Sequence, residues 1–120
     1  MSPARATERL LAAANAGNPH AQHMLGLMFL NGAGLGQDDQ QAAVWIQKAA
    51  GQGLPQAQND LAALYAAGRG LRRDLQQALF WLRRASDQGF PVARENLKRF
   101  REHSVPPLSL LSSAPSPLSH

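Results

Sequence analysis

The sequence predicts an all-α protein, a solenoid of about six antiparallel helices. Three features of the 120-residue chain lead to this prediction. Residue types recur every 36 positions, proline or aspartate alternates with glycine along the chain, and the apolar residues between these signals follow the period of a helix. Patterns typical of strands are absent.

Identical residue types return at a fixed spacing. Ala21, Ala57 and Ala93 stand 36 residues apart, and Trp45 and Trp81 have the same offset. Such self-similarity is the signature of a stacked repeat array. Further pairs at this offset are Leu25 with Leu61, Gly32 with Gly68, Gly34 with Gly70, Asp38 with Asp74, and Ala42 with Ala78.

The two ends of the chain depart from this pattern. Arg9 stands where Trp45 and Trp81 recur, and Arg101 stands where Tyr65 is found in the middle of the chain. Terminal units of a solenoid have no outer neighbour, so polar residues there act as caps. The array therefore consists of two full units with a half unit at each end.

Start and stop signals divide the chain into six helical segments. Proline suits the first turn of a helix, aspartate accepts hydrogen bonds from first-turn N–H groups, and glycine ends a helix in a left-handed conformation. The segments expected are 3–16, 19–31, 39 to 51 or 53, 55–68, 75–89 and 91–103. They form a helical-repeat domain over residues 1–103, with full repeats 21–56 and 57–92. Residues 104–120 are rich in proline and serine and are expected to form a flexible tail.

The motif of the central unit has a family pattern. Residues 57–85 read A-Q-x-x-L-x-x-L-Y-x-x-G-x-G-L-x-x-D-x-x-x-A-x-x-W-x-x-x-A, and this unit resembles the Sel-1-like repeat, a relative of the tetratricopeptide repeat. Ala62 departs from it, because the family usually has glycine there. The resemblance implies a right-handed α-solenoid that serves as an adaptor in protein complexes, often in bacteria.

Composition narrows the setting of the protein. No stretch reaches the roughly 18 apolar residues of a membrane span, and there is no cysteine for a disulfide or a thiolate metal site. A cytoplasmic protein is expected. The N-terminal segment has only a short, alanine-rich apolar part, so a first helix is favoured over a secretory signal peptide.

Catalytic patterns are weak, and we expect neither an enzyme nor a bound cofactor. His20 and His23 lie three residues apart on one expected helix, but a zinc site normally takes three or four ligands. Asp38 and Asp74 are explained as helix caps. The glycine pairs are not followed by Lys-Ser or Lys-Thr, so a phosphate-binding loop is not predicted.

One candidate binding surface is a groove along the first helices of the units. Helical geometry, at about 100° per residue, turns a set of side chains away from the core stripe. Apolar residues in such a groove favour a peptide or helix as ligand. Leu27 and Leu30 have an equally good alternative, since they would pack as core. The groove residues expected are His23, Leu27, Leu30, Asn59, Ala63, Ala66 and Arg99.

A second candidate surface is basic. Arg69, Arg72 and Arg73 surround the second glycine pair, and guanidinium groups grip carboxylates or phosphates. The net charge is +4, and basic residues gather after residue 68. The leading hypothesis is a non-catalytic adaptor that binds another protein, with an acidic partner possible at these arginines. The alternatives are a basic nucleic-acid-associated protein and, behind it, a small-ligand-binding protein or enzyme.

Overall fold

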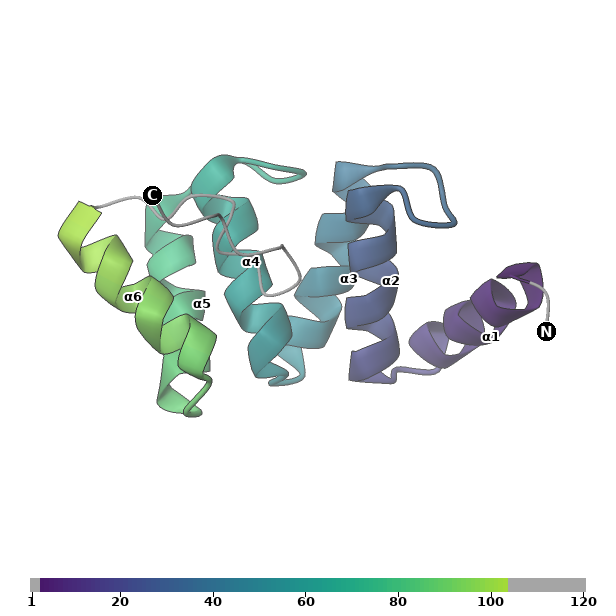
Figure 1. Cartoon of the computed structure of the whole chain (residues 1–120), viewed down its shortest axis with the longest axis horizontal. Helices are drawn as coiled ribbons and strands as arrows, with labels where there is room; N and C mark the ends of the chain where they lie inside the picture. The colour runs from purple at the N-terminus through teal and green to yellow at the C-terminus, as the bar shows by residue number, and fades with distance from the viewer. Residues whose placement is uncertain (1–2, 104–120) are drawn as a thin grey trace.

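The computed structural model describes residues 3–103 and contains six α-helices of 13 residues each in that range (Figure 1). They are α1 (Pro3–Asn15), α2 (Pro19–Asn31), α3 (Asp39–Gly51), α4 (Pro55–Ala67), α5 (Leu75–Asp87) and α6 (Pro91–His103). The expected tail, residues 104–120, lies outside the described residues. Within 3–103, every helix is too short to cross a membrane.

The 36-residue repetition persists in the helix boundaries. The odd-numbered helices α1, α3 and α5 begin at residues 3, 39 and 75, and the even-numbered helices α2, α4 and α6 begin at 19, 55 and 91. Each series therefore advances by one repeat length per helix. The prediction of an all-α repeat fold of six helices is confirmed.

Local capping explains why the helices begin and end where they do. The Asp38 side chain accepts hydrogen bonds from the backbone N–H groups of Gln40 and Gln41, and the Asp74 side chain caps α5 in the same way. Gly32 and Gly68 end α2 and α4 with φ angles of 69° and 68°. Residues with a Cβ resist this left-handed conformation, so glycine stops each helix at the same point of the repeat.

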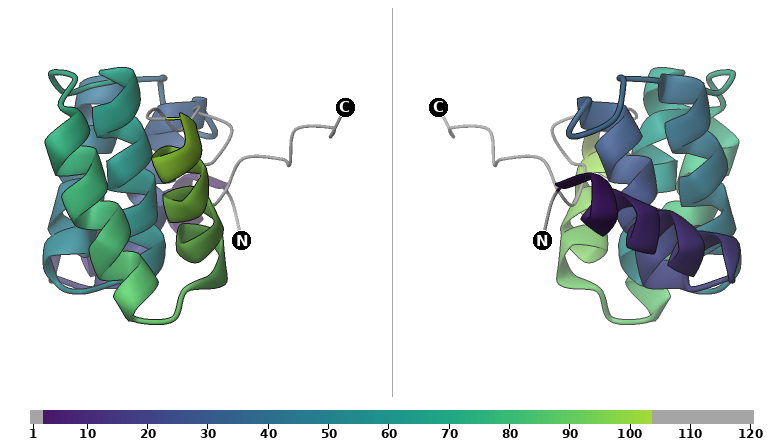
Figure 2. Two further views of the ribbon diagram at one scale, coloured as in Figure 1. Left: turned by 90° about the vertical axis from the view of Figure 1, so that its left-hand side faces the viewer. Right: turned by 90° about the vertical axis from the view of Figure 1, so that its right-hand side faces the viewer.

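Helices adjacent in sequence pack against each other along the molecule. The end-on views in Figure 2 place α2 and α6 on one side and α3 and α5 on the other. Along the long axis, α4 lies between the α2–α3 hairpin and α6, as Figure 1 shows. The middle helix thus has neighbours towards both ends of the array.

The core follows from this arrangement. Most of α4 is buried, from Ala57 through Leu64 and again at Ala66. Two core clusters flank it, and the partly buried rings of Tyr65 and Trp81 pack against both of them. The aromatic residues of the motif therefore join one unit to the next.

A glycine allows α2 and α3 to approach each other closely in the first unit. A Cβ on Gly26 of α2 would lie 2.5 Å from Cγ1 of Ile46 on α3, which is closer than real Cβ atoms come to other atoms. In the next unit the counterparts of this pair are Ala62 and Leu82, and both are buried. The departure of Ala62 from the family motif is matched by a change in the residue it faces.

Candidate interaction surfaces

A row of polar side chains links the even-numbered helices. Nε2 of His23 on α2 lies 2.6 Å from Oδ2 of Asp60 on α4. Asn96 on α6 donates a hydrogen bond of 2.8 Å from Nδ2 to Oδ1 of Asn59 on α4. Both pairs are 37 residues apart, so the same two repeat positions meet at each step of the array. We call His23, Asn59, Asp60 and Asn96 the polar seam.

The polar seam lies mostly inside the protein. Asp60 is 0% exposed, Asn59 and Asn96 are buried, and His23 is partly exposed. A buried polar group that lacks a partner costs about 1–3 kcal/mol, so these pairs favour one fixed spacing of α2, α4 and α6. The seam thus positions the helices that carry the candidate groove.

Glutamines tie the turns of successive units together in a repeated pattern. Gln52 donates from Nε2 to the carbonyl oxygen of Gly17 and to Oε1 of Gln22, both at 2.8 Å. Gln88 makes the same two bonds to Gly53 and Gln58, at 2.9 Å. The sequence interpretation missed these clamps, although glutamines at 22 and 58 and at 52 and 88 repeat with the 36-residue period.

Four of the predicted groove residues are buried, and the expectation that they line an open groove is corrected. Leu30 is 1% exposed and belongs to the same core cluster as Ala63, and Ala66 belongs to the next cluster. Asn59 is part of the polar seam. The reason is that the helical projection assumed one core direction, whereas α4 is covered on more than one side.

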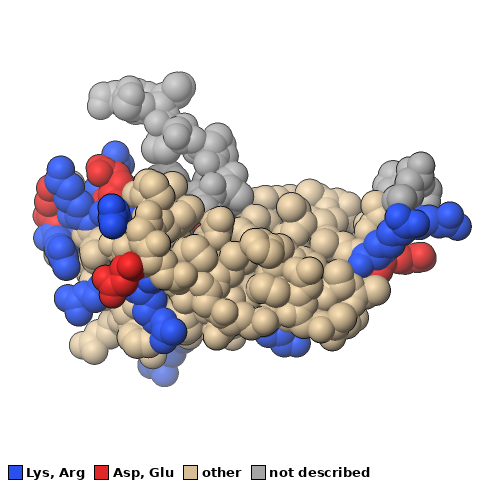
Figure 3. All heavy atoms as spheres, turned by 90° about the horizontal axis from the view of Figure 1, so that it is seen from below, with Lys and Arg blue, Asp and Glu red and all other residues tan. Residues whose placement is uncertain are grey.

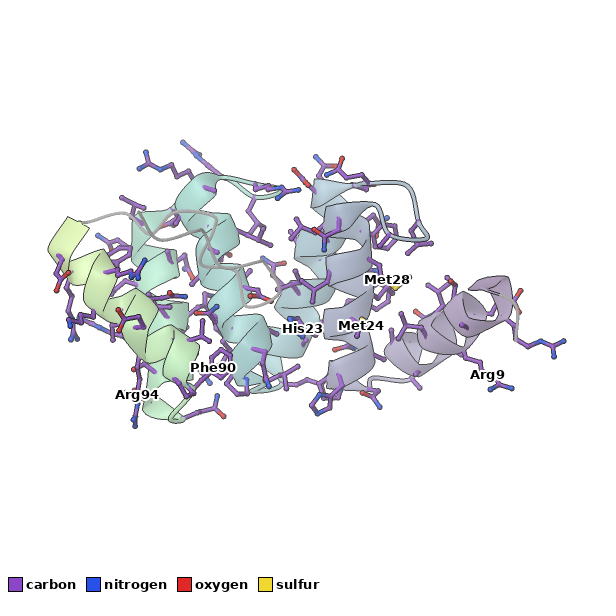
Figure 4. All side chains as sticks on the ribbon, viewed as in Figure 1. Arg9, His23, Met24, Met28, Phe90 and Arg94 are labelled. Carbon is purple, nitrogen blue, oxygen red and sulfur yellow. The ribbon has the colours of Figure 1, made fainter. Side chains whose placement is uncertain are left out.

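The remaining groove residues reach the surface of the even-numbered helices. His23 and Leu27 are partly exposed, and Arg99 is exposed, with an ion pair to Glu95 at 3.5 Å. Met24, which the sequence interpretation did not single out, is 52% exposed. In Figure 4, His23 lies between α2 and α4, whereas Met24 lies nearer α1. Met24 occupies the repeat position of Asp60. Asp60 pairs with a side chain of the preceding even-numbered helix, and α2 is the first of these helices, so the repeat could have indicated that Met24 is exposed.

The predicted arginine patch is divided by contacts within the chain. Arg69 donates from Nε to Oδ1 of Asp39 and from Nη2 to the carbonyl oxygen of Leu30, both at 3.0 Å. Arg73 donates to the carbonyl oxygen of Ala66 at 3.2 Å. The expectation of three guanidinium groups open to a partner is corrected for Arg69, which holds the loop to α2 and α3, whereas Arg73 bonds to α4 through Nε and is exposed. Arg72 is exposed.

The loop between α2 and α3 lacks the link that Arg69 makes from the loop between α4 and α5. Ala33 is the counterpart of Arg69, so an equivalent side chain cannot reach a preceding helix there. His20 and His23 share α2, and among residues 3–103 no group of three or more potential metal ligands comes together.

Comparisons with known proteins agree with this architecture. The model of the Sel1 repeat matches residues 19–54 and 55–90, two units of the same length that begin at the first residues of α2 and α4. A crystal structure of a Sel1 repeat protein from Oxalobacter formigenes is 40% identical, with a TM-score of 0.75. That match covers 87% of this chain and 78% of the other.

A second solved structure is a protective antigen present in uropathogenic Escherichia coli strains, described as displaying an SLR fold. It is 31% identical with a TM-score of 0.81, and the match covers 92% of this chain but 24% of the antigen. The chain thus spans about a quarter of the length of that protein. No curated protein matches the sequence.

Proposed function

Because the chain belongs to the Sel1 repeat family, we propose that it is a non-catalytic scaffold that binds another protein along its even-numbered helices. Repeats of this family commonly serve as protein-interaction scaffolds. The proposal here is more specific, because it names the surface formed by exposed residues of α2 and α6.

The observation that carries the proposal is where the units differ. Cap and packing positions repeat, as at Asp38 and Asp74 or Trp45 and Trp81. Two positions on the even-numbered helices change along the array instead, with Met24, Asp60 and Asn96 at one and Leu27, Ala63 and Arg99 at the other. Of these six residues, Met24 and Arg99 are exposed and Leu27 is partly exposed, whereas the other three are buried, so recognition is proposed at the outer helices α2 and α6. Solenoids use such surfaces for recognition, since a common frame can carry a different side chain at each step.

The surface would be apolar at one end and charged at the other. Met24 and Leu27 supply apolar area on α2, and methionine adapts its shape to a partner. Arg99 and Glu95 supply charges of both signs on α6. A protein segment with an apolar anchor and a polar remainder has the matching chemistry.

Site-specific photo-crosslinking tests the proposal. A photoreactive amino acid replaces Met24 or Arg99 in the full chain, in its native cells, and crosslinked proteins are identified by mass spectrometry. The control is Val44 on α3, which is 45% exposed and lies on an odd-numbered helix. We expect the same protein at Met24 and Arg99 and not at Val44.

Two results would overturn this proposal. One is recovery of the same proteins in equal yield from Val44, which would mean that contacts are not confined to the even-numbered helices. The other is crosslinking to nucleic acid alone, with binding that weakens by orders of magnitude between about 50 and 200 mM salt. That outcome would favour the nucleic-acid alternative.

A further inference from the structure

The C-terminal end of the array contains an apolar hollow between α5 and α6. Its volume is about 740 Å³, within the range of roughly 300–1,000 Å³ typical of binding pockets. The apolar lining residues are Leu75, Leu79 and Phe80 on α5 and Phe100 on α6. Phe80 is 48% exposed, which is unusual for a ring of this size. We call this feature the end pocket.

Arginines surround the end pocket. Arg83, Arg84 and Arg101 line it, together with one acidic residue, Asp87. The guanidinium group of Arg84 lies 5.5 Å from the centre of the Phe80 ring, which holds it at the rim. Within residues 3–103, none of these three arginines makes an ion pair. Figure 3 shows Lys and Arg gathered at this end of the molecule.

The preceding unit indicates what such a face receives. The counterpart of Leu79 is Ala43 on α3, which is buried in a cluster that Tyr65, Leu71 and Trp81 of the following unit pack against. At that step of the array, apolar side chains from helices and the loop between them cover Ala43, whereas Val44, the counterpart of Phe80, stays 45% exposed. Beyond α6, the described part of the chain supplies no further helix, so the end pocket presents a stacking face that accepts a helix.

Charge then distinguishes the candidate occupants. Residues 104–120 contain leucines but no aspartate or glutamate, so they would leave the arginines unpaired. A second copy would bring either another arginine-rich end or α1, whose Arg5 and Arg9 outnumber Glu8. An acidic segment satisfies both the apolar floor and the basic rim, because carboxylates pair with guanidinium groups in bidentate fashion.

We propose that the end pocket binds an acidic amphipathic helix of a partner protein. Its apolar side chains fill the floor over Leu79, Phe80 and Phe100, and its carboxylates pair with Arg83, Arg84 and Arg101. The end pocket shares α6 with the surface of α2 and α6 proposed above, but it uses Phe100 and Arg101 of that helix, where the other surface uses Glu95 and Arg99. Peptide binding tests the end pocket, and crosslinking at Met24 tests the other surface.

A synthetic peptide provides the probe. It is a fluorescein-labelled helix of about 18 residues, with leucines at i, i+3, i+4 and i+7 spacing and glutamates elsewhere. One control peptide has the same composition with its leucines scattered around the helix, and a second has lysine in place of glutamate. Fluorescence anisotropy with the full chain should show saturable binding of the first peptide. The affinity for each control peptide should be weaker by on the order of tenfold or more.

Variants locate the binding site. Phe80→Ser and the double variant Arg83→Glu with Arg84→Glu should each lower affinity by about tenfold or more. The matched controls are the counterparts on α3, Val44→Ser and Lys48→Glu, which should change affinity by less than about twofold. All these positions are exposed or at the surface, and circular dichroism checks that helicity is kept. Equal losses at both sets, or absence of binding by the unaltered chain, would overturn the proposal.

Two measurements test whether residues 104–120 or a second copy of the chain occupies the end pocket instead. Deletion of residues 104–120 should leave the peptide affinity unchanged, whereas tighter binding would identify that segment as the occupant and overturn the proposal. Light scattering should report the same mass for the unaltered chain and for Phe80→Ser. A dimer that disappears in Phe80→Ser would identify a second copy as the occupant, and would also overturn it.

Discussion

The contact between successive units can be tested at one glycine. Gly70 lies in the loop between α4 and α5 with a φ angle of +74°, and a Cβ there would overlap the carbonyl oxygen of Asp39 and lie 3.2 Å from Cβ of Ala43. Asp39 is the first residue of α3, so the obstacle is backbone and cannot rotate away. Gly34 is the repeat counterpart, with a φ angle of +81°. The atom nearest to a Cβ added there would be Cε of Met28, at 3.4 Å.

Comparison of Gly34→Ala with Gly70→Ala separates the cost of the left-handed backbone from the cost of the clash between units. Alanine in either position pays about 1–2 kcal/mol for the left-handed backbone. Only Gly70→Ala must also push two units apart, and overpacking of this kind costs about 1–3 kcal/mol more. Gly34→Ala should therefore cost about 1–2 kcal/mol of unfolding free energy, and Gly70→Ala about 2–5 kcal/mol.

Urea unfolding followed by far-UV circular dichroism measures this difference. A small domain has a urea dependence of about 1–3 kcal/mol per molar, so an extra cost of about 1–3 kcal/mol should separate the two midpoints by roughly 0.3–3 M. The helical signal before unfolding should be the same in both variants. Equal destabilisation would refute the reasoning, because it would mean that the loop does not pack against α3.

Three further predictions use the same measurement. Gly26→Ala should destabilise the chain by about 1–3 kcal/mol through its clash with Ile46, and Ile46→Leu in the same chain should recover part of the loss; additive losses would mean that the two do not pack together. Trp81→Ala should cost about 3 kcal/mol, since the ring packs against two clusters, and a loss below about 1 kcal/mol would contradict that placement. Arg69→Ala should cost about 1–2 kcal/mol, and a double-mutant cycle with Asp39→Ala should show coupling; zero coupling would make the arginine an ordinary surface residue.

The helices themselves could be predicted from the sequence because their signals are local. Pro19 and Pro55 begin helices, Asp38 and Asp74 cap them, and Gly32 ends one within a few residues of the expected place. Each signal acts on backbone groups next to it. Because the pattern repeats every 36 residues, the helix boundaries expected in one unit also predict those in the others.

The candidate site was harder to predict because it depends on how units tilt against one another. The polar seam joins positions 37 residues apart, one more than the repeat, so a comparison of equivalent positions does not pair His23 with Asp60. The sequence is compatible with Leu30 in the groove or in the core, and its cluster with residues of α3 and α4 places it in the core. Arg69 reaches back across a unit boundary, and nothing in its neighbouring residues indicates that contact.

Hydrogen exchange with the partner recovered by crosslinking tests whether recognition lies on the even-numbered helices. The full chain is compared by mass spectrometry alone and with that partner, and exchange is followed helix by helix. The account predicts slower exchange in α2 and α6 on binding, with α1 and α3 unchanged. Slower exchange in α3 with none in α2 or α6 would contradict it.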